Sequence, residues 1–268
     1  MQPLGVIREP LPQNFAIRCM FLANSVCRAP HFGRERGHRF GDALDIAAKR
    51  LHVHVNLPAH RRKALLDLVK PCRDLVKKVG VTANSHKVIR NLLDEVASQA
   101  KAAGEDIRLG AKTSQDEGDD TPDTIRIFDD NDGPLDALSA NEIDVVGGTS
   151  WLWARPDYRD AVDVMFVDEA GQMSLANVLA VSQSANSLVL LGDPQQLDQP
   201  EKGTHPDGVG VSALEHVLGG HATMPPEKGI FLPTTWRMSP TLTAFTSELF
   251  YEGKLSPKDG LERQRLSG

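Results

Sequence analysis

Cysteine and long apolar runs are scarce in this chain of 268 residues. The three cysteines, Cys19, Cys27 and Cys72, lack the spacing of a zinc site and are too few to form a disulfide framework. No apolar run approaches the length of a membrane span, and no signal peptide opens the chain. We therefore predict a protein that works in a reducing, cytoplasmic setting without a membrane partner.

Acidic residues are scarce at the start of the chain and abundant after it. Residues 1–73 hold 13 Lys and Arg against 5 Asp and Glu, whereas residues 74–268 hold 17 against 31. The first stretch is rich in Arg, His and Pro and lacks clear periodicity, so we interpret it as an atypical segment that is poorly ordered or read from a shifted frame. The alternative is a genuine basic segment, helical within 43–69, that binds nucleic acid electrostatically.

An apolar run that ends in two adjacent carboxylates is the most informative stretch. Val162 and Val164–Val167 are typical of a strand covered on both faces, and Asp168 and Glu169 follow directly. The carboxyl edge of a parallel sheet is where α/β folds bind ligands. One carboxylate there can hold Mg²⁺ through its water shell while the other polarises an attacking water. The alternative is a strand end with two solvated acids.

A second apolar run, Ser187–Leu191, ends in the polar turn Gly192–Leu197. The residues between the two runs are enough for one helix, over 174–184, so we predict a βαβ unit with its two polar loops side by side. A glutamine in the second loop can hydrogen-bond a γ-phosphate or the attacking water without adding charge. Taken alone, the second loop is equally compatible with a polar turn that has no function.

Five segments, in order, resemble motifs of superfamily 1 helicases. The wording is most similar to the branch that includes the nonsense-mediated-decay helicase, and especially to the helicase half of bacterial RecB-like nuclease–helicase fusions. The resemblance covers about 74–258 and implies an α/β fold with a RecA-like parallel sheet flanked by helices. The segments are VGVTANSH (79–86), GGT (147–149), DEAGQ (168–172), GDPQQL (192–197) and TTWRMSP (234–240).

ATP and Mg²⁺ are the cofactors that this resemblance implies. Asp168 would coordinate Mg²⁺ through water, and Glu169 would act as general base. The remaining residues expected at the nucleotide are Gly192, Asp193, Gln172, Gln196 and Arg237. Arg237 would reach the γ-phosphate from a second RecA-like domain. Its planar guanidinium group suits this role because it matches the arrangement of phosphate oxygens. The alternative for this arginine is a surface side chain stacked on Trp236.

Single-stranded DNA or RNA is the partner that the resemblance implies. Short hydroxyl and amide side chains suit sugar–phosphate contacts, which position a strand without reading its sequence. The residues concerned are Thr82, Asn84, Ser85, His86, Gly148 and Thr149. The alternative is that Asn84 or Ser85 caps the following helix. We expect Trp151 and Trp153 to pack in the core or between domains rather than to stack on bases.

The phosphate-cradling loop G-x-x-x-x-G-K-[ST] is missing from the sequence. Its only Gly-Lys pair, Gly253-Lys254, is followed by Leu255. Helicase motifs V and VI and any nuclease motif are missing as well. We therefore expect a fragment at both ends, with a RecB-like nuclease domain only in its full-length parent. The competing function is a catalytically inactive nucleic-acid-binding remnant.

The expected organisation has three parts: the basic segment 1–73, a partial first RecA-like domain over 74–229, and the start of a second over 230–268. Within the first domain, residues 105–136 are acidic and suggest an insert or solvated linker with a short strand at 123–128. The other expected elements are strands at 79–82 and 142–146 and helices at 87–102, 136–140, 211–218 and 240–250.

Overall fold

The computed structural model describes residues 78–113, 124–196, 211–226 and 228–263. The predictions for residues 1–73, including the shifted reading frame and the helical segment within 43–69, lie outside these residues.

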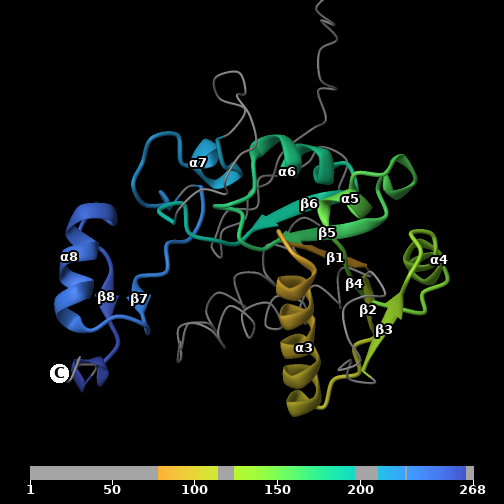
Figure 1. Cartoon of the computed structure of the whole chain (residues 1–268), viewed down its shortest axis with the longest axis horizontal. Coiled ribbons are helices and arrows are strands. Elements are labelled where there is room, and N and C mark those ends of the chain that lie inside the picture. Colours follow the sequence, from red (N-terminus) through yellow and green to blue (C-terminus); the bar gives the residue numbers. More distant parts are fainter. Residues whose placement is uncertain (1–77, 114–123, 197–210, 227, 264–268) are drawn as a thin grey trace, which may run out of the picture.

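A six-stranded parallel sheet lies at the centre of the described ranges (Figure 1). Its strands follow the order β3-β2-β4-β1-β5-β6, and each neighbouring pair is parallel. Parallel strands need crossover connections that cover the sheet, so this arrangement confirms the predicted α/β fold with a RecA-like sheet. The strands are β1 (Val79–Thr82), β2 (Leu109–Lys112), β3 (Ile125–Phe128), β4 (Val145–Gly147), β5 (Val162–Val167) and β6 (Ala185–Leu190).

Helices cover both faces of this sheet (Figure 1). The helix α3 (His86–Ala103) packs against one face, over β1, β2, β4 and β5. The opposite face carries α4 (Gly133–Ser139), α5 (Ser150–Trp153), α6 (Leu175–Ser182) and α7 (Ala213–Leu218). Each face buries an apolar core of its own. Residues 164–167 of β5 and 188–190 of β6 are therefore buried on both sides of the sheet, which explains the apolar runs at the ends of these strands.

The ends of α3 follow from its sequence. Ser85 Oγ accepts a hydrogen bond from Val88 N at 3.2 Å, which satisfies one of the unpaired N–H groups of the first turn. Gly104 ends the helix with a φ of 69°, a conformation that glycine adopts without steric cost. The predicted helix over 87–102 is thus confirmed, extended by one residue at each end. Its buried side recurs at intervals of three and four, through Ile89, Leu92, Leu93, Val96 and Ala100.

The strands β5 and β6 form the predicted βαβ unit with α6 between them. They pair in parallel register from Val162 opposite Ala185 to Val167 opposite Leu190. Both strands end at the same edge of the sheet, so the loops 168–174 and 191–196 start side by side.

The acidic stretch 105–136 contributes β2 and β3 to the sheet, which corrects our expectation of an insert or linker. The two strands pair with each other, and β2 also pairs with β4. Leu109, Ala111 and Ile125 are buried within them. Strands of four residues among many Asp and Glu residues hold too few apolar positions for a sequence pattern to reveal them. Only β3 was expected, as the short strand at 123–128.

The connection from β3 to β4 differs from the prediction in its boundaries. A helix was expected at 136–140, and α4 starts three residues earlier, with Pro134 in its first turn. Glu142 N donates to Ala137 O at 2.8 Å and thereby closes the end of this helix. The backbone near Glu142 is consequently engaged with α4, and the strand predicted over 142–146 begins only at Val145.

Residues 230–263, here called the C-terminal unit, lie beside the sheet (Figure 1). In this unit β7 (Thr234–Thr235) pairs in parallel with β8 (Ser256–Pro257), and α8 (Pro240–Phe250) connects them. The predicted helix 240–250 is confirmed, with proline at its first position after the N-cap Ser239. No pattern had predicted β8, which is only two residues long.

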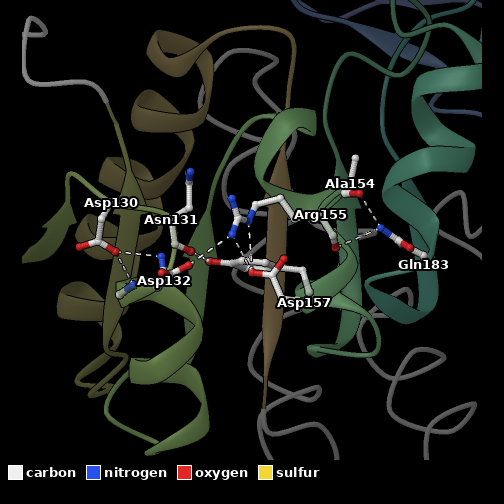
Figure 2. A network of polar contacts seen from close by, with 9 residues as sticks. Asp130, Asn131, Asp132, Ala154, Arg155, Asp157 and Gln183 are labelled. Carbon is white, nitrogen blue, oxygen red and sulfur yellow. Dashed lines mark hydrogen bonds and ion pairs between the residues drawn. The ribbon is translucent and has the colours of Figure 1, made fainter.

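A polar network joins three connections on the side of α4, α5 and α6 (Figure 2). Arg155 Nη2 lies 3.3 Å from Asp132 Oδ1 and 3.0 Å from Asp157 Oδ2. Gln183 Nε2, at the end of α6, donates to Ala154 O at 2.7 Å. Exposed ion pairs contribute little stability, so we attribute to this network mainly the relative placement of the loops.

Candidate nucleotide site

The loops after β5 and β6 are joined by backbone hydrogen bonds from their first residues onward. Leu191 N donates to Val167 O at 2.9 Å, and Ala170 N donates to Leu191 O at 2.8 Å. Asp168 N donates to Thr82 O at 2.8 Å, which joins the end of β1 to the same place. The strands β1, β5 and β6 thus present their carboxyl ends as one continuous edge.

Gly171 is required where these two loops come closest. A Cβ at this position would overlap the carbonyl oxygen of Asp193, which belongs to the backbone and cannot swing away. Steric hindrance therefore explains why this position of the segment DEAGQ is a glycine, because any side chain here would keep the loop after β6 from approaching.

The two glutamines that the sequence assigned to the phosphate lie in contact. Gln172 Nε2 donates to Gln196 Oε1 at 3.4 Å, which is long for such a bond. Gln196 N donates to Asp193 O, also at 3.4 Å. Two amide side chains from loops 24 residues apart in sequence therefore meet within the same edge as Asp168.

Asp168 and Glu169 occupy different surroundings although they are adjacent. Asp168 is only 6% exposed, and its Oδ1 accepts a hydrogen bond from Glu169 N at 3.0 Å. A buried carboxylate offers an oxygen ligand that suits a hard cation such as Mg²⁺. No group of three or more metal-ligating side chains is found among the described residues. A magnesium ion held by Asp168 would therefore keep mostly water and phosphate ligands, as this ion prefers.

Glu169 adopts a left-handed backbone conformation, with a φ of 53°. Such a conformation is uncommon outside glycine and is concentrated at functional sites. Gln172 N donates to Glu169 O at 2.8 Å and closes the turn that follows. Glu169, which we predicted to be the general base, thus has a strained backbone and begins a closed turn.

Asp193 contacts a residue that the sequence did not single out. Its Oδ1 accepts from Gln195 N at 3.0 Å, and its Oδ2 accepts from the hydroxyl of Tyr251 at 2.7 Å. Both carboxylate oxygens of Asp193 thus accept hydrogen bonds within the protein, and its expected contact with the nucleotide stays a prediction. Tyr251 lies 58 residues further along the chain, and no local pattern marks it as a partner of this loop.

Arg237 lies on the connection between β7 and α8, and its side chain is exposed. Its backbone N–H donates to Thr235 Oγ1 at 3.3 Å. Lys258 Nζ lies 3.0 Å from the centre of the Trp236 ring, so a lysine, not the neighbouring arginine, stacks on this tryptophan. Among the described residues, no contact joins the guanidinium to the two loops, and its role at a phosphate stays a prediction.

The residues assigned to a nucleic-acid strand gather at the carboxyl ends of β1 and β4. Gly148 N donates to Val81 O at 3.0 Å, which joins the two strand ends. Ser85 caps α3, as one alternative predicted. Thr82 Oγ1 and Asn84 Nδ2 are buried and have no hydrogen-bond partner among the residues that the structure describes, an arrangement that is uncommon in proteins. His86 begins α3 and Thr149 precedes α5.

The two tryptophans after Thr149 have opposite environments. Trp153 is fully buried, and its Nε1 donates to Gly148 O at 3.0 Å and to Val81 O at 3.2 Å. Packing in the core was correctly predicted for this residue. Trp151 is 87% exposed, which rules out packing in the core of this domain, while packing between domains stays a prediction. The four-residue helix α5 turns its second residue outward and its fourth inward.

A parallel sheet with acidic and amide-bearing loops meeting at its carboxyl edge defines a RecA-like α/β domain. No family model matches the chain. The chain is 32% identical to the mouse protein named 5'-3' DNA helicase ZGRF1 over 117 residues. This aligned segment covers 42% of the chain and 6% of the mouse protein. The chain is 33% identical over 106 residues to the Arabidopsis thaliana protein named probable helicase MAGATAMA 3, which is 38% of this chain and 12% of that protein.

These similarities relate the chain to helicases, of which it spans only a small part. In the described ranges, no helix combines the length and the apolar character needed to cross a bilayer.

Proposed function

We propose that this chain carries the magnesium–triphosphate site of an ATP-dependent helicase or translocase, whose ATP hydrolysis is coupled to movement on DNA or RNA. The observation that supports this most is the meeting of two loops, in which Gln172 and Gln196 touch next to Asp168. A triphosphate site needs oxygen ligands for a cation and neutral hydrogen-bond donors for phosphate oxygens. The two loops supply both at one edge of the sheet.

In this proposal, each residue of the two loops, together with Arg237, has a separate role in binding or hydrolysing ATP. Asp168 would hold Mg²⁺ through its water shell, which would supply positive charge at the phosphates. Glu169 accepts the proton of the attacking water, because it directly follows Asp168 and its carboxylate is therefore close to the magnesium-bound phosphates. Gln172 and Gln196 direct amide N–H groups towards the γ-phosphate, and Gly192 allows the backbone to come close to it. Arg237 approaches from the second domain.

The nucleic-acid strand runs along the carboxyl ends of β1 and β4 in this proposal. The polar atoms of Thr82 and Asn84 that lack a partner within the described part of the chain lie at the end of β1, where small movements would expose them to sugar and phosphate oxygens. The two relatives named as helicases support a nucleic-acid partner in general. The contact residues are Thr82, Asn84, Ser85, His86, Gly148 and Thr149.

The finer assignment follows the resemblance of the motifs. We propose the branch of superfamily 1 that includes the nonsense-mediated-decay helicase, and within it the helicase half of bacterial RecB-like nuclease–helicase fusions. A cytoplasmic location and a nuclease domain in the full-length parent belong to the same assignment, as does the division at residue 230 into two RecA-like domains.

An inactive nucleic-acid-binding remnant is the second candidate, because the sequence lacks the loop G-x-x-x-x-G-K-[ST]. That loop supplies a lysine and a nest of N–H groups for the β- and γ-phosphates. A chain that retained only the strand-binding edge would bind DNA or RNA without hydrolysing ATP.

Phosphate release from ATP in the presence of single-stranded DNA or RNA separates the two candidates. The proposal predicts release that the strand stimulates and that Glu169→Gln abolishes, because the amide cannot accept the proton of the attacking water. The matched control is Glu248→Gln on the exposed side of α8, which should leave the release unchanged. Strand binding without phosphate release would instead support the remnant.

A further inference from the structure

We propose that Tyr251 is a positioning residue, which ties the loop after β6 to the C-terminal unit and holds Gln196 in place. This inference rests on the proposed function, because it concerns the same nucleotide site. Tyr251 follows α8 directly as its C-cap residue, and the loop after β6 belongs to the sheet. The contact therefore links the C-terminal unit to the sheet, beside which that unit lies in Figure 1.

The hydroxyl of Tyr251 donates to Asp193 Oδ2 at 2.7 Å. A hydrogen bond to an ionised carboxylate is shorter and stronger than one between neutral groups. The ring of Tyr251 also lies 6.0 Å, centre to centre, from the ring of Phe231, with an angle of 38° between the planes. Phe231 belongs to the segment that leads into β7, so the tyrosine is held from its own side while its hydroxyl reaches the other.

Asp193 passes this contact on to the site. Its other oxygen, Oδ1, accepts from Gln195 N at 3.0 Å, and its carbonyl oxygen accepts from Gln196 N at 3.4 Å. Gln196 in turn meets Gln172 in the loop after β5. One side chain thus fixes both the phenol of Tyr251 and the turn that presents Gln196, so a displacement of α8 displaces the glutamine.

A second contact anchors the same turn of the C-terminal unit without touching Asp193. Thr223 Oγ1 donates to Glu252 Oε2 at 2.6 Å, and Lys254 Nζ donates to Thr223 Oγ1 at 2.8 Å. Thr223 lies after α7, and its neighbour Ala222 accepts from Gln195 Nε2 at 3.1 Å through its backbone carbonyl, a bond that Thr223→Val keeps because the substitution removes only a side-chain hydroxyl. Loss of this anchor weakens the attachment of the C-terminal unit but leaves the turn at Asp193 intact, which makes Thr223→Val a matched control.

Amide hydrogen exchange of the full chain tests the tie itself, without any ligand. Tyr251→Phe keeps the ring and removes only the hydroxyl. We expect the amides of Gln195 and Gln196 to exchange about tenfold faster in this variant, since a hydrogen bond to a charged group is lost from the turn that protects them. In Thr223→Val these two amides should keep their wild-type rate. Equal rates in Tyr251→Phe and wild type, or the same increase in both variants, would overturn the inference.

The same variants with a non-hydrolysable ATP analogue and Mg²⁺ show whether the tie serves the site. Binding should slow exchange in α8 of the wild type and of Thr223→Val, but not in Tyr251→Phe. If the wild type binds the analogue without any change in α8, communication through Tyr251 is refuted while the nucleotide site stands. If no analogue binds, the proposed function fails, and the ligand-free exchange still decides whether Tyr251 positions the loop.

Discussion

Glu169 combines a strained backbone with the place of a candidate general base. A residue other than glycine in the left-handed region costs about 1–3 kcal/mol, and Glu169 has a φ of 53°. The conformation follows from the geometry of the edge, because Asp168 N is held by Thr82 O and Ala170 N by Leu191 O. The residue between these two fixed points has to turn, which accounts for its positive φ.

Glycine at this position should relieve the strain. We expect Glu169→Gly to raise the free energy of unfolding by about 1 kcal/mol, measured by denaturant titration, because glycine adopts a positive φ without steric cost. Asn141 has nearly the same φ, 54°, far from the site. Asn141→Gly should change stability less, because asparagine tolerates this conformation better than glutamate does, and it should leave ATP hydrolysis unchanged. A destabilised Glu169→Gly would mean that side-chain contacts of Glu169 outweigh the strain.

Asp130 predicts how stability depends on pH. The backbone N–H groups of Gly133 and then Asp132 donate to its carboxylate and hold the pKa below its ordinary value of 3.8. A lowered pKa in the folded state stabilises the protein above that ordinary value, and this stabilisation is lost as the pH falls through the lowered pKa. Asp130→Asn should thus be less stable than wild type at pH about 7, with the difference shrinking in acid.

Chemical denaturation at several pH values measures this difference. A constant difference between Asp130→Asn and wild type across the acid range would contradict the account.

At the level of elements, the close approach of the loops after β5 and β6 depends on Gly171. Gly171→Ala should destabilise the protein by about 1–3 kcal/mol through overpacking and should also weaken nucleotide binding, because the new methyl group pushes the Asp193 backbone away. Gly104→Ala is the matched control. Its added Cβ has no neighbour within 4 Å, but its φ of 69° is unfavourable for alanine. It should lower stability by about 1–2 kcal/mol and leave nucleotide binding unchanged, as equilibrium titration would measure.

The elements that carry the site were predictable from sequence for a physical reason. Residues 164–167 of β5 and 188–190 of β6 are buried on both faces, so these apolar runs end abruptly at the loops. By contrast, β2 is four residues long within an acidic stretch, and β7 and β8 have two residues each. Their existence depends on pairing with strands distant in sequence, which no local pattern records.

The same limit applies to the site. The polar loops and their proximity were predictable, since parallel neighbours end at the same edge. The strained φ of Glu169 and the contact between Asp193 and Tyr251 were not, because they depend on how the chain folds back on itself. The sequence could not predict that Trp153 is buried and Trp151 exposed, because helical spacing alone does not fix which side of so short a helix faces the core.

For the whole molecule, the arrangement has a sheet covered on both faces and a C-terminal unit attached beside its carboxyl edge (Figure 1). Within the described residues, the hydroxyl of Tyr251 at Asp193 and the bond from Thr223 to Glu252 both anchor this unit. The anchor at Tyr251 is also continuous with the candidate nucleotide site. If the chain is part of a helicase, the loops after β5 and β6 should therefore both contact a bound nucleotide.

Hydrogen exchange with saturating ATP analogue and Mg²⁺ tests that requirement most directly. If both loops surround one magnesium-bound triphosphate, residues 168–172 and 192–196 become protected together, only when Mg²⁺ is present, and both lose the protection in Asp168→Asn. Protection of one loop alone, or protection that persists without Mg²⁺ or in Asp168→Asn, would contradict the account.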